Sequence, residues 1–174
     1  RLLENPLVKK VMSGRQFFNI LRYLHCCPVT NQEHTADNYD PAYKIAEIRD
    51  YLEARYIRLF VPGQQLSLDE TLIRAFGRIK FKVRIVTKAA RYGIKIYVIT
   101  DATTAFVFWV VIYTGKTTYY ADQDSQADRL KTVQIVNRLV EPFVGSHRTI
   151  YVDRFYTSLD LLKSLAEKNL YVTG

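Results

Sequence analysis

The spacing of apolar residues predicts two helices before residue 62. Ser13 can cap a first helix in which Phe17, Leu21 and Leu24 recur at helical spacing, a stripe typical of ordinary packing. After a turn at residues 38–41, a second helix carries one apolar face, made of Ile45, Ile48, Leu52, Tyr56 and Leu59. The Pro62–Gly63 turn dipeptide ends this helical part.

Beyond residue 63 the pattern changes to strands and then alternates between helix and strand. Extended segments are expected at residues 65–76, in the basic stretch that follows, at 92–100 and at 105–113. The last of these, AFVFWVVIY, is apolar throughout, which predicts an interior strand of a sheet. Helical patterns at residues 126–144 and 158–168 then alternate with short strands at 149–153 and 170–173.

This order of elements is that of a ribonuclease H-like fold, an α/β class in which helices flank a mixed sheet. A crossover helix returns the chain parallel to a strand that is already in place, so residues 149–153 should pair beside residues 65–76. We expect residues 1–62 to form a small helical region ahead of the core. Residues 63–174 would form the core itself, truncated at its C-terminal side.

The expected pairing brings together two carboxylates, Asp69 in the first strand and Asp153 at the end of the later one. Taken singly, Asp69 fits a surface strand residue and Asp153 fits a cap on the following turn. Two carboxylates that face one cleft repel each other and need a proton or a cation for compensation. Mg²⁺ suits this case because it prefers oxygen ligands and keeps positions for water and phosphate. The pair therefore predicts a metal-dependent catalytic site for phosphodiester chemistry.

A basic ladder, defined here as Arg78, Lys80, Lys82 and Arg84, follows the first strand. Its cations alternate with apolar residues, which in a strand would place all four charges on one face. No acidic residue occurs between residues 71 and 100, and the chain has a net charge of +8. These charges favour an anionic partner, DNA in particular, with further phosphate contacts expected from Lys88, Lys95 and Arg154.

Other classes of site are disfavoured. Cys26 and Cys27 are adjacent and poorly placed to bridge each other, and together with His25 and His34 they do not have the spacing of a zinc site. The longest apolar run, residues 105–113, is too short to cross a bilayer, so we expect no membrane partner. The sequence starts without Met and stops within an expected strand, which indicates a segment of a longer protein.

Three segments resemble, in order and spacing, the transposase domain of the piggyBac family: PGQQLSLDETLIRAFGR, YGIKIYVITDATTAFVFWVVIYTGK and YVDRFYTSLDLLKSLAEKNLYVTG. The family has one catalytic aspartate in an S-[LI]-D-E setting, which matches Asp69, and one in a D-x-F-Y-T-S setting, which matches Asp153. The upstream segments LRYLHC and YKIAEIRDYLE also resemble the family. The stretch IKFKVRIVTKAARYGIK departs from the family's pattern after residue 78, so the details of DNA contact there do not carry over.

The resemblance implies a cut-and-paste DNA transposase, with strand cleavage at transposon ends that depends on Mg²⁺ or Mn²⁺ and strand transfer into TTAA targets. Asp69 and Asp153 would be two of three metal-binding aspartates, and the third would lie beyond Gly174. We therefore expect this segment to be inactive by itself. A homodimer and a nuclear location are expected as well.

Two alternatives remain open at this point. A domesticated derivative could bind DNA or chromatin without cutting it, because the basic ladder needs no metal. A different ribonuclease H-like nuclease, acting on RNA or on a hybrid, is disfavoured by the D-x-F-Y-T-S resemblance.

Overall fold

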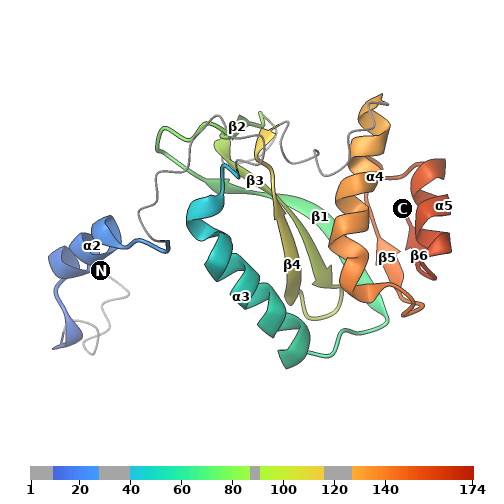
Figure 1. Cartoon of the computed structure of the whole chain (residues 1–174), viewed down its shortest axis with the longest axis horizontal. Coiled ribbons are helices and arrows are strands. Elements are labelled where there is room, and N and C mark those ends of the chain that lie inside the picture. The colour runs from blue at the N-terminus through green and yellow to red at the C-terminus, as the bar shows by residue number, and fades with distance from the viewer. Residues whose placement is uncertain (1–9, 28–39, 87–90, 116–126) are drawn as a thin grey trace.

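The computed structural model describes residues 10–27, 40–86, 91–115 and 127–174 (Figure 1). Its helices are α2 (Gly14–Tyr23), α3 (Tyr43–Leu59), α4 (Ala127–Val140) and α5 (Leu159–Glu167), with a short 3₁₀ turn at Glu141–Phe143. Its strands are β1 (Gln65–Arg74), β2 (Val83–Arg84), β3 (Tyr92–Asp101), β4 (Val107–Ile112), β5 (Thr149–Tyr151) and β6 (Tyr171–Thr173).

All six strands form one mixed sheet. The order along the sheet is β2-β3-β1-β5-β6, with β4 also paired to β3. β1 runs antiparallel to β3 and parallel to β5, and β6 continues the parallel part beside β5. The crossover through α4 thus returns the chain to the side of β1, as the sequence predicts, and the ribonuclease H-like arrangement is confirmed.

The core lies on the face of the sheet covered by α4 and α5 (Figure 1). Leu66 and Leu68 alternate with more exposed residues along β1, which sends them to this face. Ile99 lies opposite Leu68 in β3 and Ile150 lies opposite Leu66 in β5. All four side chains are almost completely buried, so the alternation of β1 fixes which of its residues remain available for chemistry.

Gly93 allows β3 to begin close against β1. A Cβ atom at this position would collide with the backbone carbonyl of Ile73. Only glycine leaves that space free, so the close approach of the two strands depends on it.

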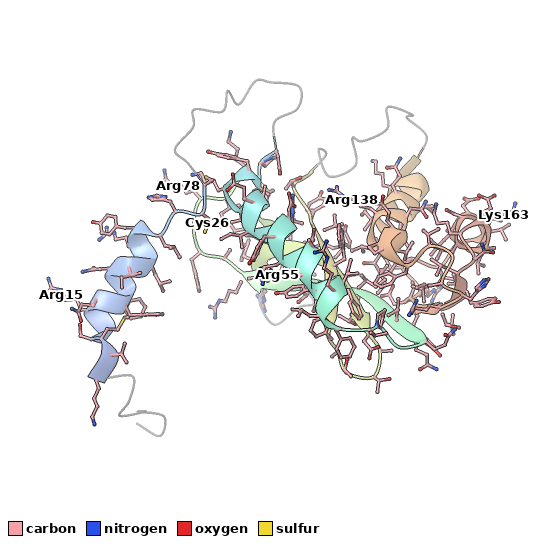
Figure 2. The ribbon with its side chains drawn as sticks, turned by 60° about the horizontal axis from the view of Figure 1, so that its bottom comes forward. Arg15, Cys26, Arg55, Arg78, Arg138 and Lys163 are labelled. Carbon is pink, nitrogen blue, oxygen red and sulfur yellow. The ribbon has the colours of Figure 1, made fainter. Side chains whose placement is uncertain are left out.

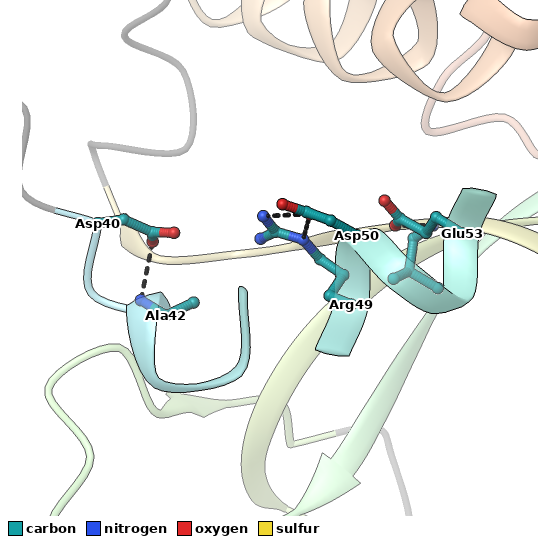
Figure 3. Close-up of polar contacts among 6 residues, drawn as sticks. Asp40, Ala42, Arg49, Asp50 and Glu53 are labelled. Carbon is teal, nitrogen blue, oxygen red and sulfur yellow. Dashed lines mark hydrogen bonds and ion pairs between the residues drawn. The ribbon is translucent and has the colours of Figure 1, made fainter. Parts of the chain in front are cut away.

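The expectation that residues 105–113 form an interior strand is wrong. Within the described part of the chain, β4 pairs with β3 alone and lies at an edge of the sheet. Its apolar character is explained by the helices, because both α3 and α4 contact it. The Val110 amide donates to the Glu53 carboxylate of α3 at 3.2 Å, whereas the Tyr113 amide donates inward to the Lys95 carbonyl at 2.9 Å. Figure 3 shows Glu53 on α3 near the Arg49–Asp50 pair.

The expectation of an extended strand through the basic ladder is also wrong. Only Val83 and Arg84 pair with β3, and residues 75–82 form turns and irregular structure. Exposed and half-buried side chains still alternate along this stretch. Arg78, Lys80 and Arg84 are exposed, while the apolar residues between them are half-buried. Partial burial of those apolar side chains is therefore enough to produce alternating apolar and charged residues, even where the backbone does not pair as a strand.

The N-terminal helices bury little of their apolar surface. The capping box of Ser13 and Gln16 starts α2 as expected, yet α2 has no buried residue and Phe17 is 48% exposed. The predicted packing of this stripe is therefore absent from the described residues. In α3, Tyr56 contacts the ring of Phe106 edge-on, at 5.7 Å between ring centroids. None of the described helices is both long and apolar enough to cross a membrane.

Candidate two-carboxylate site and basic surface

Asp69 and Asp153 each lie two residues beyond the last residue pair of the β1–β5 register. The parallel register ends with Ser67 opposite Tyr151, and the same step of two residues leads from this pair to Asp69 on one side and Asp153 on the other. Both aspartates are exposed, in contrast to the leucines that precede Asp69. Residues that are 84 positions apart in the sequence thus follow the same residue pair, Asp69 within β1 and Asp153 two residues after the end of β5.

A tight turn holds the Asp153 carboxylate. Its Oδ1 accepts a hydrogen bond of 2.8 Å from the Phe155 amide, and its backbone carbonyl accepts from the Tyr156 amide at 3.1 Å. The Thr157 hydroxyl donates to the same carbonyl at 3.0 Å. This turn also confirms the structural role considered for Asp153, because an aspartate commonly closes such a turn with its side chain.

Asp69 and Glu70 point to opposite faces of β1, as expected from their adjacency. The Asp69 Oδ1 accepts from the Glu70 amide at 2.7 Å. The Glu70 side chain lies on the core face, where its Oε2 accepts a hydrogen bond of 3.0 Å from the Tyr156 hydroxyl. Glu70 is thus directed away from the side on which Asp69 lies.

The two aspartates suit a hard cation. Each uses Oδ1 for a backbone amide, and in the described part of the chain the Oδ2 atom of each makes no hydrogen bond. The described residues hold no group of three or more side chains of the kinds that bind metals. Mg²⁺ is commonly held by one or two carboxylates together with water and phosphate oxygens, so a pair of this kind fits it.

Asp101, the carboxylate at the end of β3, does not belong to this pair. It lies opposite Leu66 in the β1–β3 register, three residues from the level of Asp69, or about 10 Å at roughly 3.4 Å per residue. It is buried, and both of its oxygens accept hydrogen bonds from nearby turns. Asp101 is thus a residue that closes turns at the end of β3.

The candidate phosphate-binding cations occupy different environments. Arg78, Lys80 and Arg154 are exposed, and Figure 2 shows Arg78 far from Lys163 of α5. Lys82 is half-buried and donates to the Gly77 carbonyl at 3.1 Å, so its ammonium group is partly engaged in the loop.

The remaining cations lie near aromatic rings or outside the described residues. The Arg84 guanidinium lies 5.7 Å from the centre of the Tyr92 ring. The Lys95 ammonium lies 4.7 Å from the Tyr97 ring and 5.3 Å from the Phe155 ring, next to the Asp153 turn. Lys88 falls outside the described residues.

Tyr156 is the residue at this site that the sequence interpretation did not single out. Its ring is 1% exposed and contacts Tyr97 edge-on, at 6.5 Å between centroids. Burial, followed by the negative charge of Glu70, raises the pKa of the Tyr156 hydroxyl far above its usual range. The sequence did contain a signal for this contact, because Glu70 directly follows Asp69 and Tyr156 lies three residues after Asp153.

Comparison with protein families gives a match over the whole chain. The family described as Transposase IS4 matches residues 1–174. Among solved structures, a synaptic complex of piggyBac transposase with hairpin DNA is similar, with a TM-score of 0.80 and 29% sequence identity. That likeness covers 93% of this chain and 33% of the other, so the chain spans about a third of the protein that it matches.

Two complexes of the Mos1 transposase have much weaker likeness. The strand transfer complex has a TM-score of 0.38 and 13% identity, covering 95% of this chain and 51% of that one. The paired-end complex with the left transposon end has a TM-score of 0.36 and 14% identity, covering 94% and 51%. These values are too low to support an argument about this chain.

Proposed function

Because the chain belongs to the Transposase IS4 family and resembles piggyBac transposase, we propose that it supplies two catalytic carboxylates of a cut-and-paste DNA transposase. The observation that carries this proposal is the parallel β1–β5 register, which ends at Ser67 and Tyr151, two residues before Asp69 and Asp153. The chain spans about a third of the piggyBac transposase that it matches, so the proposal concerns the full-length protein, in which a third aspartate would complete the site.

Asp69 and Asp153 would hold a divalent cation, Mg²⁺ or Mn²⁺, which would polarise the phosphate and lower the pKa of a bound water. The residues of this chain would provide the rigid oxygen ligands. The Phe155 amide orients the Asp153 carboxylate, and the Glu70 amide orients that of Asp69. Each carboxylate thereby presents its other oxygen outward.

Binding of the DNA backbone is proposed for the exposed cations near these strands. Arg78, Lys80 and Arg84 extend into solvent, and Arg154 directly follows Asp153. Lys95 would act at the Asp153 turn, and Lys88 completes the set on the ground of charge alone. Neutralising contacts of this kind with phosphates releases counterions, which makes binding depend on salt. TTAA target choice, a homodimer and a nuclear location are parts of the same proposal, supported by the resemblance to piggyBac transposase.

The catalytic role is tested with Asp69→Asn and Asp153→Asn in the full-length protein. Both variants should lose cleavage of transposon-end DNA in Mg²⁺ while keeping most of their DNA affinity. Asp160→Asn, which changes an exposed aspartate in the first turn of α5, is the matched control and should cleave normally. Normal cleavage by either of the first two variants would refute the assignment.

The cations are tested separately. The Lys80→Ala/Arg84→Ala variant should bind DNA more weakly and reduce the slope of log affinity against log salt by up to about 2, one for each lost contact. Lys163→Ala, on α5 and far from Arg78 in Figure 2, removes one charge from a distant surface. A double variant whose salt slope equals that of the control would show that these cations face away from DNA.

A domesticated DNA-binding or chromatin-binding protein is the second candidate function. It is favoured because the described residues hold no group of three or more metal-binding side chains, and because exposed cations such as Arg78 and Lys80 can bind DNA without a metal. The two candidates separate in one experiment with the full-length protein. Binding of end DNA without cleavage in either Mg²⁺ or Mn²⁺ would select the second.

A further inference from the structure

We propose that the Tyr156 hydroxyl and the Glu70 carboxylate form a clasp that sets the separation of Asp69 and Asp153. Both would be positioning residues for the metal pair, acting through the aspartates. The inference rests on the proposed function for the role of the cation, whereas the contact itself is a feature of the fold.

The need for such a clasp follows from where the strands stop pairing. The β1–β5 register ends at Ser67 and Tyr151, two residues before the aspartates. The next amide, that of Val152, donates to the Thr173 carbonyl of β6 at 2.9 Å, because alternate amides of a strand between two neighbours point to opposite sides. Because the β1–β5 pairing ends two residues before the aspartates, a side-chain contact beyond that end adds a constraint on the position of Asp153 relative to Asp69.

The Tyr156–Glu70 hydrogen bond spans this gap directly. It joins the residue after Asp69 to a residue three positions after Asp153, at 3.0 Å. The Tyr156 amide and the Phe155 amide both bind Asp153, so residues 153–157 form one hydrogen-bonded turn. Holding the Tyr156 hydroxyl therefore holds the whole turn, and with it the Asp153 carboxylate.

The environment makes the clasp stiff. Tyr156 is 1% exposed, and its ring packs edge-on against Tyr97, which lies opposite Glu70 in the β1–β3 pairing. A hydrogen bond from a hydroxyl to an ionised carboxylate is stronger than one between neutral groups, and the packed ring of Tyr156 limits the movement of its hydroxyl. Outer contacts of this kind orient metal ligands, and their loss typically costs about 10–100-fold in metal affinity or activity.

The test measures Mn²⁺ binding to the full-length protein in the absence of DNA, by calorimetry. Tyr156→Phe and Glu70→Ala each remove one partner and should raise the Mn²⁺ dissociation constant about 10–100-fold. Glu70→Gln keeps an oxygen that can accept from the Tyr156 hydroxyl, so its dissociation constant should stay within a few-fold of wild type. The double variant Glu70→Ala/Tyr156→Phe should be no worse than the poorer single variant, because the two residues act through one contact.

Cleavage kinetics and a matched tyrosine complete the experiment. Tyr156→Phe should lower kcat for end cleavage and leave the KM for DNA unchanged, since the clasp does not face the DNA. Tyr151→Phe removes a hydroxyl from the more exposed neighbouring tyrosine of β5 and should change neither quantity. Should Tyr156→Phe fold poorly, the Glu70→Ala and Glu70→Gln pair gives the same comparison.

Two kinds of failure can be told apart. If Tyr156→Phe and Glu70→Ala lower the thermal midpoint but bind Mn²⁺ like wild type, the clasp is only structural and this inference is overturned. If wild type and Asp69→Asn bind Mn²⁺ equally, the proposed carboxylate site itself is wrong, and the clasp loses its metal role with it.

Discussion

Replacing Asp101 with alanine should destabilise the protein by several kcal/mol and should leave the chemistry of Asp69 untouched. The Asp101 side chain accepts four hydrogen bonds. Its Oδ1 accepts from the Thr103 amide at 3.0 Å, the Thr104 amide at 2.8 Å and the Thr104 hydroxyl at 3.0 Å. Its Oδ2 accepts from the Gly63 amide at 2.9 Å, which ties the turn before β1 to the end of β3.

The expected magnitude follows from these contacts. A hydrogen bond to a charged group contributes about 1.5–3 kcal/mol, and neighbouring bonds are not additive. Alanine removes all four acceptors, and water can replace some of them at the exposed threonines, so we expect a loss of about 3–5 kcal/mol. Asparagine keeps an oxygen for the threonines but turns an NH₂ group toward the Gly63 amide, for a loss of about 1–3 kcal/mol.

The dependence on pH gives a second, independent signature. Hydrogen bonds from the Thr104 and Gly63 amides lower the pKa of Asp101 below its usual range. A lowered carboxyl pKa stabilises the folded state at pH values above the ordinary value of 3.8, and this stabilisation disappears as the pH falls through the folded-state pKa. Asp101→Asn should therefore lose its disadvantage in strong acid.

Urea unfolding followed by Trp109 fluorescence, at pH 7 and at pH 3, measures both effects. Stability at pH 7 should decrease in the order wild type, Asp101→Asn, Asp101→Ala. Asp160→Ala, in the exposed first turn of α5, controls for the loss of a negative charge. The reasoning fails if Asp101→Ala unfolds at the urea concentration of wild type, or if it abolishes Mn²⁺ binding in a protein that remains as stable as before.

Three further predictions concern stability. Desolvation raises the pKa of Glu53, so the ionised carboxylate is unfavourable in the folded state at neutral pH, and the protein gains stability as the pH falls through the folded-state pKa toward 4.5. Glu53→Gln should therefore exceed wild type in stability most at pH 7, as measured by chemical denaturation across this pH range. Gly93→Ala should cost at least about 1–3 kcal/mol in urea unfolding, because its Cβ collides with the Ile73 carbonyl. Ser158→Ala removes the cap that accepts from the Leu161 amide and should cost about 0.5–2 kcal/mol in the same assay.

Matched variants make these predictions decisive. Gly14→Ala places a methyl group in open space at the start of α2 and should not destabilise the protein, so an equal loss at Gly14 and Gly93 would exclude the steric explanation. Ser158→Asp keeps a capping oxygen and should retain most of the stability that alanine loses. A Glu53→Gln difference that does not vary with pH would show that ionisation is not the cause.

The position of β5 beside β1 could be predicted from the sequence because it depends on connectivity. A crossover helix leaves few positions for the returning strand, and the observed β1–β5 pairing is the one expected. The opposite orientations of Asp69 and Glu70 follow equally from the period of a strand.

The edge position of β4 could not be predicted in this way. An apolar run indicates that both faces of a strand are covered, and the run does not say whether strands or helices lie beside it. The alternation in the basic ladder likewise indicates which side chains are partly buried, but it does not indicate whether the backbone pairs with a neighbouring strand. The Tyr156–Glu70 contact joins residues 86 positions apart, and only the packing of the turn against β1 determines it.

The Glu53 contact with β4 also determines how the sheet could grow. The outward amide of Val110 is occupied by Glu53, and α3 lies along that edge, whereas β6 forms the opposite edge in the described part of the chain. Open-ended stacking of sheets requires an exposed edge strand on both sides of each sheet. Within the described part of the chain, a second sheet could pair with β4 only by displacing α3, so the Glu53 contact opposes edge-to-edge stacking at this strand.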